Sequence, residues 1–227
     1  MRLAGGSKSC RFCAHRGQSA AFNEALPHIT GEYFTWCDSD DLMTPDCVEK
    51  KTRWLMDHPE IGMVRNNGTV LDGDHGTVLS ESARPEDREC KDIFHELFLD
   101  RTYCYAGCYM IRTDLFFECY PERQIPLSPE GQNLQLLLPP ASKTPCGYID
   151  EKLHIYCRRS GGHSSQNRSY QENLKRLRNF TTLKLTLLDY CDCDGAYYEA
   201  LAKEQEEAKR KNLIYSAVQR ARKELGK

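Results

Sequence analysis

The chain has 227 residues, of which 40% are hydrophobic and 28% are charged, and its formal net charge at pH 7 is -2. This length predicts one folded domain with a helical appendage, and the charge argues against a protein that binds nucleic acid through a broadly basic surface. Because no stretch approaches the roughly 20 apolar residues of a membrane span, and because the start of the chain is too short and polar for a signal peptide, we expect a cytoplasmic protein.

The first part of the chain alternates between helix and strand signals. An irregular segment rich in Gly, Ser and Arg at residues 1–16 precedes an alanine-rich helix that we predict over 17–29. The apolar aromatic run at 33–37 predicts a buried strand. The Thr-Pro-Asp sequence at 44–46 predicts a helix start, because it supplies a cap, a first-turn proline and an acid near the positive helix end. With a second strand at 61–64, this order indicates an α/β fold.

The remaining elements follow in chain order. They are a hairpin or loop at 72–76, an amphipathic helix at 91–99, a bent strand at 103–111, helices at 114–117 and 131–138, and short strands at 147–149 and 153–156. From residue 166 the pattern is mostly helical, with a break at 189–195. We therefore divide the chain into an irregular N-terminus (1–16), a domain (17–165) and a helical C-terminal extension (166–227).

Twelve cysteines are many for this length, but most of them lie within apolar or helical patterns. In a reducing compartment such cysteines act as small buried hydrophobic residues. Two closer pairs are Cys10-x-x-Cys13 and Cys191-x-Cys193. A structural zinc site needs four ligands, and the sequence offers no second pair at suitable spacing. A cysteine-based zinc or redox module is therefore only a minor alternative.

An acidic run, Asp38-Ser39-Asp40-Asp41, follows the predicted strand at 33–37. Open α/β sheets bind ligands at the carboxyl ends of their strands. Two carboxylates one residue apart in a turn can face the same space and hold a hard divalent cation. Such a cation neutralises charge that develops on a diphosphate leaving group. The alternative for the motif by itself is a solvated loop or a helix cap.

Two blocks of sequence resemble the family-2 glycosyltransferases. The first block runs through a Gly turn, an alanine-rich helix with an asparagine, G-E-Y, an apolar strand, D-S-D-D and a proline-started helix, over residues 17–45. The second block looks like a bacterial branch of the family that carries G-Q-N, C-G-Y-I and a terminal Y-x-x-R followed by H-S, over residues 131–164. Together the blocks cover about residues 15–165. The resemblance implies the GT-A fold, a Rossmann-like mixed sheet flanked by helices.

The resemblance implies metal-dependent transfer of a sugar from a nucleotide-sugar donor, a UDP-sugar above all, to a hydroxyl of a glycan or lipid-linked acceptor. It implies inversion by direct displacement, Mn²⁺ or Mg²⁺ as cofactor, and a place in cell-surface polysaccharide biosynthesis. The C-terminal helices carry cationic residues near apolar ones, so they could rest on the inner face of a membrane. We favour the alternative that they pack on the domain.

The resemblance assigns roles to single residues. Asp40 matches the direct metal ligand, and Asp38 matches a ligand that also faces the ribose or sugar. Asp41 supports the pair or caps the next helix. The further residues matched to the donor site are Asn23 near the nucleotide, Arg158 near a phosphate and His163 near the metal or phosphate. The alternative for these three is an ordinary surface side chain.

The catalytic base is the least regular part of the match. Many family members present an E-D pair before the helix that faces the acceptor, and its carboxylate deprotonates the acceptor hydroxyl. Here the segment reads Glu130-Gly131-Gln132-Asn133, so Glu130 is the candidate base, and the expected aspartate is replaced in register by Gly131 or Gln132. An amide cannot take a proton, but Gln132 and Asn133 can orient a sugar hydroxyl. Asp150 and Glu151 better fit a strand turn.

The family's opening elements, including S-T-Y-N and D-D-G-S segments that build the nucleoside pocket, do not occur in this sequence. We therefore expect a domain that is incomplete at its N-terminus and binds donor weakly or not at all. The alternative function is a truncated, non-catalytic remnant of such an enzyme.

Overall fold

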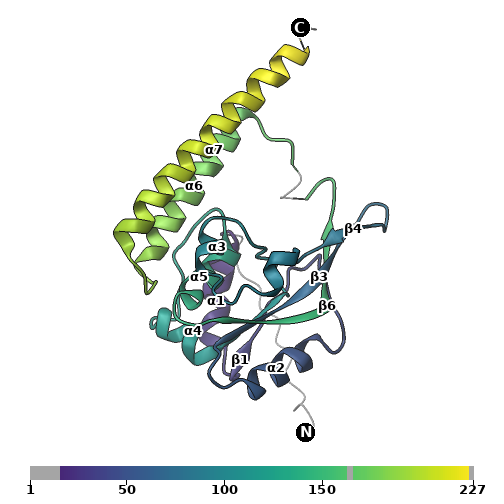
Figure 1. Ribbon diagram of the computed structural model, residues 1–227, viewed down its shortest axis with the longest axis vertical. Helices are drawn as coiled ribbons and strands as arrows, with labels where there is room; N and C mark the ends of the chain where they lie inside the picture. The colour runs from purple at the N-terminus through teal and green to yellow at the C-terminus, as the bar shows by residue number, and fades with distance from the viewer. Residues whose placement is uncertain (1–15, 163–165, 225–227) are drawn as a thin grey trace.

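The computed structural model describes residues 16–162 and 166–224 (Figure 1). Its strands are β1 (Tyr33–Phe34), β2 (Leu42–Met43), β3 (Met63–Asp72), β4 (Val78–Glu81), β5 (Tyr109–Arg112) and β6 (Cys146–Arg158). Its α-helices are α1 (Gln18–Ala25), α2 (Cys47–Asp57), α3 (Phe94–Phe98), α4 (Thr113–Cys119), α5 (Gln132–Ala141), α6 (Tyr170–Leu188) and α7 (Gly195–Glu224). Short 3₁₀ helices occupy Leu26–His28 and Pro85–Arg88.

The strands form one mixed sheet in the order β1-β5-β3-β6-β2, and β4 pairs with β3 beside this path. β3 and β6 run parallel from Met63 opposite Cys146 to Asp72 opposite Arg158. The other pairings are antiparallel. This mixed sheet, flanked by helices and followed by a long C-terminal helix, confirms the expected GT-A-like fold class.

Helices cover both faces of the sheet (Figure 1). Successive side chains of a strand point to opposite faces. Accordingly, Met63 of β3 joins the large core under α3, α4 and α5, whereas Val64 joins a small core with Leu55 of α2. β3 therefore contributes to both layers, which explains why its first six residues are all buried, although Arg65, Asn66 and Asn67 are polar.

The C-terminal helices α6 and α7 form an antiparallel hairpin that extends from the body (Figure 1). Ser169 and Glu172 make a capping box at the start of α6. Leu183 and Leu187 of α6 are buried in the main core. The Lys184 ammonium, which is also buried, donates to the Phe98 carbonyl, to Asp100 at 3.0 Å and to Gln205 at 2.8 Å. Burial lowers the pKa of Lys184. The hairpin is thus docked to the body by its buried half.

Several expected elements differ from the observed ones. The two short strands predicted at 147–149 and 153–156 are one strand, β6, in which Asp150 and Glu151 form a bulge between the register pairs Asn66–Ile149 and Asn67–Lys152. The strand predicted at 103–111 pairs only at its end, as β5. The strand predicted at 33–37 pairs only at Tyr33–Phe34. In each case long-range pairing, which local apolarity does not encode, sets the strand ends.

Candidate active site

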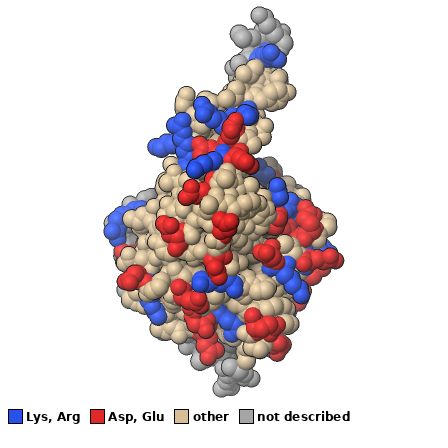
Figure 2. All heavy atoms as spheres, turned by 60° about the vertical axis from the view of Figure 1, so that its left-hand side comes forward, with Lys and Arg blue, Asp and Glu red and all other residues tan. Residues whose placement is uncertain are grey.

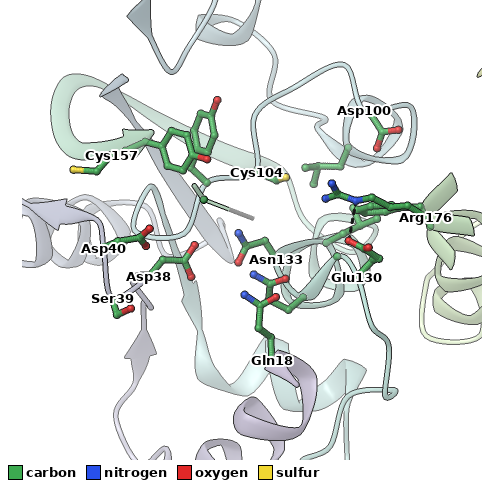
Figure 3. Close-up of a pocket in the computed structure, with 18 of the residues that line it drawn as sticks. Gln18, Asp38, Ser39, Asp40, Asp100, Cys104, Glu130, Asn133, Cys157 and Arg176 are labelled. Atoms are coloured by element: carbon green, nitrogen blue, oxygen red, sulfur yellow. Dashed lines mark hydrogen bonds and ion pairs between the residues drawn. The ribbon is translucent and has the colours of Figure 1, made fainter. Parts of the chain in front are cut away.

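A cavity of about 400 Å³ opens beside the acidic turn between β1 and β2. Asp38, Ser39 and Asp40 line one side of it, and Glu130 with Arg176 lies on the opposite side (Figure 3). The turn, the start of α5, the end of β6 and the inner face of α6 all contribute lining residues. The cavity is therefore built jointly by the predicted domain and the C-terminal hairpin.

The acidic turn concentrates negative charge at the cavity wall. Asp38 is half-buried and Asp40 is exposed. Burial raises the pKa of Asp38, and the neighbouring carboxylates of Asp41 and Asp40 raise it further. Like charges at close range disfavour ionisation of each other. A cation bound at this turn would relieve that repulsion.

Asp41 faces the protein interior instead of the cavity. Its Oδ1 accepts a hydrogen bond from the backbone N–H of Cys157 at 2.9 Å. Its Oδ2 lies 3.2 Å from Nε2 of His154, and both side chains are almost fully buried. Asp41 thus ties the acidic turn to β6, which gives a physical basis for the supporting role that the sequence suggested for it.

His154 is a buried residue behind the acidic turn, outside the cavity lining, that the sequence analysis did not single out. Its Nδ1 lies 3.4 Å from Sγ of Cys108. Its ring also lies against Gly107, where φ is +82° and an added Cβ would come within 2.4 Å of Cδ2 of His154. The signals available were a histidine inside an apolar strand and a glycine inside an apolar run. Neither of them reveals the partner across the sheet.

The opposite wall begins at the start of α5. Glu130 accepts a hydrogen bond from Nε of Arg176 at 2.9 Å. Gln132 and Asn133 also line the cavity, and Oδ1 of Asn133 accepts from Nε1 of Trp36 at 2.9 Å. This last bond joins the start of α5 to the segment that leads into the acidic turn.

Gly131, one of the two positions (with Gln132) at which the family pattern would place an aspartate, is sterically restricted. Its φ is +74°, in the left-handed region that favours glycine. A Cβ at this position would lie 2.6 Å from Cδ2 of Leu183 and 3.0 Å from Cε1 of Phe180. Because α6 packs directly on the glycine, an aspartate at this position would have an unfavourable φ and would require the side chains of Leu183 and Phe180 to shift.

Two other predicted residues lie outside the cavity lining. The side-chain amide of Asn23 donates to the Ile125 carbonyl at 2.9 Å and accepts from the Ile125 N–H at 2.8 Å. Arg158 is exposed at the end of β6, and its neighbour Arg159 lines the cavity instead. His163, together with Cys10 and Cys13, lies outside the described residues.

The donor atoms at the turn suit a hard cation. Among the residues that the structure describes, no group of three or more His, Cys, Asp or Glu side chains could hold a metal ion. Mg²⁺ commonly uses only one or two protein carboxylates and takes its other ligands from water and substrate phosphates. The carboxylates of Asp38 and Asp40 fit that mode of binding, in which the substrate completes the site.

The described cysteines are free thiols, and several of them, including Cys47, Cys108 and Cys146, are buried. Burial raises the pKa of Cys37 to about 11. A thiol with a raised pKa is a poor metal ligand and nucleophile at neutral pH. Within the described part of the chain, the cysteines therefore give no support to a zinc or redox module.

No helix in the described part of the chain is both long and apolar enough to cross a membrane.

Comparisons with known proteins agree with the observed fold. The family model for glycosyl transferase family 2 matches residues 6–118. No curated protein gives a significant match. The crystal structure of S. aureus TarS 1–349 in complex with UDP-GlcNAc matches with a TM-score of 0.53 at 15% identity, over 88% of this chain and 53% of that one. A crystal structure of S. aureus TarS matches with the same TM-score at 14% identity, over 88% of this chain and 31% of that one.

A mannosyltransferase, PcManGT from Pyrobaculum calidifontis, in complex with GDP-Man and Mn²⁺, matches at 15% identity with a TM-score of 0.41, over 91% of this chain and 60% of that one. For comparison, this chain spans about half the length of TarS 1–349. At these identities, the TarS matches show a shared fold.

Proposed function

The chain belongs to glycosyltransferase family 2 through residues 6–118, and we propose on that premise that it transfers a sugar from a nucleotide-sugar donor to a hydroxyl of a glycan or lipid-linked acceptor. The observation that carries this proposal is the cavity itself, in which the carboxylates of Asp38 and Asp40 face Glu130 across a space of about 400 Å³. That volume lies within the usual range for small-molecule sites.

The proposed reaction is a direct displacement with inversion. The acceptor hydroxyl oxygen forms a bond to the anomeric carbon, the bond from that carbon to the donor diphosphate breaks, and Glu130 takes the hydroxyl proton. Gln132 and Asn133 are suited to orient sugar hydroxyls, because a side-chain amide both donates and accepts hydrogen bonds. The products are the new glycoside and a nucleoside diphosphate.

Asp38 and Asp40 are the residues that would hold Mn²⁺ or Mg²⁺, which would neutralise charge on the leaving diphosphate. We assign supporting roles to the remaining residues on the strength of the family pattern. Asp41 fixes the turn. The family pattern places Asn23 near the nucleotide and Arg158 and His163 near the phosphates, although Asn23 and Arg158 do not line the cavity. A UDP-sugar is the preferred donor class, since TarS 1–349 is seen with UDP-GlcNAc.

The proposed setting is cell-surface polysaccharide synthesis. The cationic residues of the hairpin, such as Lys175 and Arg178, are the feature that would favour a peripheral contact with the inner face of a membrane. The mixed charge of α7 and the burial of Leu183 and Leu187 in the core instead favour packing on the domain.

Titration calorimetry with UDP-GlcNAc, with and without Mn²⁺, tests the donor half of this proposal. We expect Mn²⁺-dependent binding that Asp40→Asn weakens by about tenfold or more, in line with the loss of one metal ligand. Glu60→Gln is a matched control, because Glu60 is exposed in the turn after α2 and does not line the cavity. Binding by neither this donor nor a panel of other nucleotide sugars would favour the non-catalytic remnant.

A further inference from the structure

A second cavity, of about 470 Å³, lies along the α6–α7 hairpin. Three of its lining residues, Asp100, Arg176 and Phe180, also line the first cavity. The two spaces therefore share a wall, and Arg176 at that wall holds the candidate base Glu130. A molecule in the second cavity would have one end beside the proposed reaction centre.

The spacing of the lining residues shows that the second cavity belongs to the hairpin. Asn173, Arg176, Leu177 and Phe180 follow the helical repeat along α6. Lys209, Asn212, Leu213 and Ser216 follow the same repeat along α7. Residues at positions i, i+3, i+4 and i+7 share one face of a helix, so one face of each helix is turned toward this space.

Ion pairs of Asp100 hold together the end of the second cavity that lies next to the first cavity. Asp100 has a φ of +58°, and its carboxylate is paired with Lys184 at 3.0 Å and also with Lys209. Lys184 is buried, and Gln205 of α7 both accepts from it and donates to the Leu99 carbonyl. The loop after α3 is thereby tied to both helices of the hairpin.

The chemistry of the lining matches a carbohydrate. Leu177, Phe180 and Leu213 present apolar surface, while amide, hydroxyl and charged groups stand beside them on the same helix faces. A sugar ring has the same mixed character, with apolar C–H faces and a rim of hydroxyls that both donate and accept hydrogen bonds. Sites that combine apolar walls with a few placed polar groups fix the orientation of such ligands.

The charge pattern of α7 argues against a membrane surface as the partner that covers the second cavity. Figure 2 shows basic and acidic side chains close together on the upper part of the molecule, over the hairpin. Two of the ion pairs on α7 join Lys203 to Glu199 at 3.5 Å and Lys211 to Glu207 at 2.7 Å. A helix that lies in a lipid surface presents instead a broad apolar face with cations opposite.

We propose that this second cavity is a glycan-binding groove that holds the acceptor of the reaction, with the acceptor's terminal sugar beside Glu130. The assignment of the bound glycan as the acceptor rests on the proposed function, but glycan binding to the groove can be tested without measuring catalysis. The C-terminal hairpin would then determine which acceptor the protein uses, while the acidic turn handles the donor.

The test uses the full chain and an array of neutral and acidic oligosaccharides, with phosphatidylglycerol vesicles as a lipid probe. Ser216→Trp places a large side chain in the groove, and Val218→Trp is the matched control, because Val218 is exposed two residues further along α7 and does not line the groove. We expect glycan binding by the wild type and by Val218→Trp, and a loss of about tenfold or more in affinity for Ser216→Trp. UDP-GlcNAc binding should be the same in all three proteins.

Each other outcome is informative. The groove assignment is overturned by no glycan binding to the wild type, by equal glycan binding to Ser216→Trp, or by binding of vesicles alone that Ser216→Trp abolishes. Glycan binding that Ser216→Trp abolishes, in a protein that binds no nucleotide sugar, would support the groove and contradict the proposed transferase function.

Discussion

Arg176 of α6 donates a hydrogen bond from Nε to Oε2 of Glu130 over 2.9 Å, so a residue of the C-terminal hairpin holds the carboxylate proposed as the catalytic base. The ion pair is largely shielded from solvent, with the Glu130 side chain 11% exposed. The hairpin is therefore positioned to influence catalysis directly, in addition to its packing on the core.

Replacement of Glu130 by Gln is expected to lower the rate of sugar transfer by roughly 10²–10⁴-fold, because an amide cannot accept the hydroxyl proton. Donor binding should be retained, since the acidic turn lies on the opposite side of the cavity. Single-turnover kinetics with the donor identified by screening would measure the first effect, and calorimetry the second. Glu122→Gln, at an exposed acid that does not line the cavity, should change neither, and a Glu130→Gln enzyme with full transfer activity would remove Glu130 from the mechanism.

Asp38 should make stability depend on pH in a specific direction. Its pKa is raised in the folded protein by burial and by the carboxylates of Asp41 and Asp40. The native state therefore binds more protons than the unfolded state between the ordinary carboxyl pKa and the raised one, so stability falls as pH rises through that window. Asp38→Asn should raise the Tm at neutral pH, and the gain should disappear below about pH 4, where the unfolded carboxyl is also protonated.

The same thermal denaturation, repeated with Mn²⁺, tests whether the acidic turn binds a cation. If the turn holds a cation, Mn²⁺ should raise the Tm of the wild type more than that of Asp38→Asn, because the ion offsets the repulsion that the substitution already removes. A Tm for Asp38→Asn at neutral pH equal to or below that of the wild type would show that the acidic turn is not electrostatically strained.

Gly107 is expected to be intolerant of a side chain because of His154. Gly107→Ala combines an unfavourable φ of +82° with a Cβ that would lie 2.4 Å from Cδ2 of His154. Strain and overpacking together predict a loss of about 2–4 kcal/mol in the free energy of unfolding. Urea denaturation would measure it. Gly76→Ala is the matched control, since Gly76 also has a positive φ, +71°, but has nothing within 4 Å of the added Cβ. Equal losses of unfolding free energy in the two variants would mean that the contact with His154 does not destabilise Gly107→Ala.

The local parts of this structure could be predicted from the sequence, and the long-range parts could not. The α/β class, the position of the acidic turn after a strand, and the helix that starts after Glu130 depend on patterns among neighbouring residues, whereas β2, which follows the turn, was not predicted. The contact between Asp41 and His154 depends on a pairing between segments more than 100 positions apart. The same holds for the docking of α6, which brings Arg176 to the cavity. A solvated extension and a docked hairpin have similar helical patterns, so the sequence favoured packing on the domain without locating it.

The docking of α6 on Gly131 gives the last prediction. A Cβ on Gly131 would lie 2.6 Å from Cδ2 of Leu183, and its φ of +74° is unfavourable for other residues. Gly131→Ala should therefore destabilise the protein by about 2–4 kcal/mol and displace α6, which would separate Arg176 from Glu130. Leu183→Ala removes a buried leucine and should itself cost about 2–5 kcal/mol.

If the clash is the cause, the double variant should be less destabilised than the sum of the two single variants, by about 0.5–3 kcal/mol. Denaturation of all four proteins completes this double-mutant cycle. Leu137→Ala, a buried change on α5 that is not among the neighbours of Gly131, should instead add to Gly131→Ala within roughly 0.5 kcal/mol. If the unfolding free energy changes of Gly131→Ala and Leu183→Ala were also additive, the contact of Leu183 with position 131 would not be the cause of the destabilisation. In that case the absence of the family's aspartate at this position would need a cause other than the hairpin.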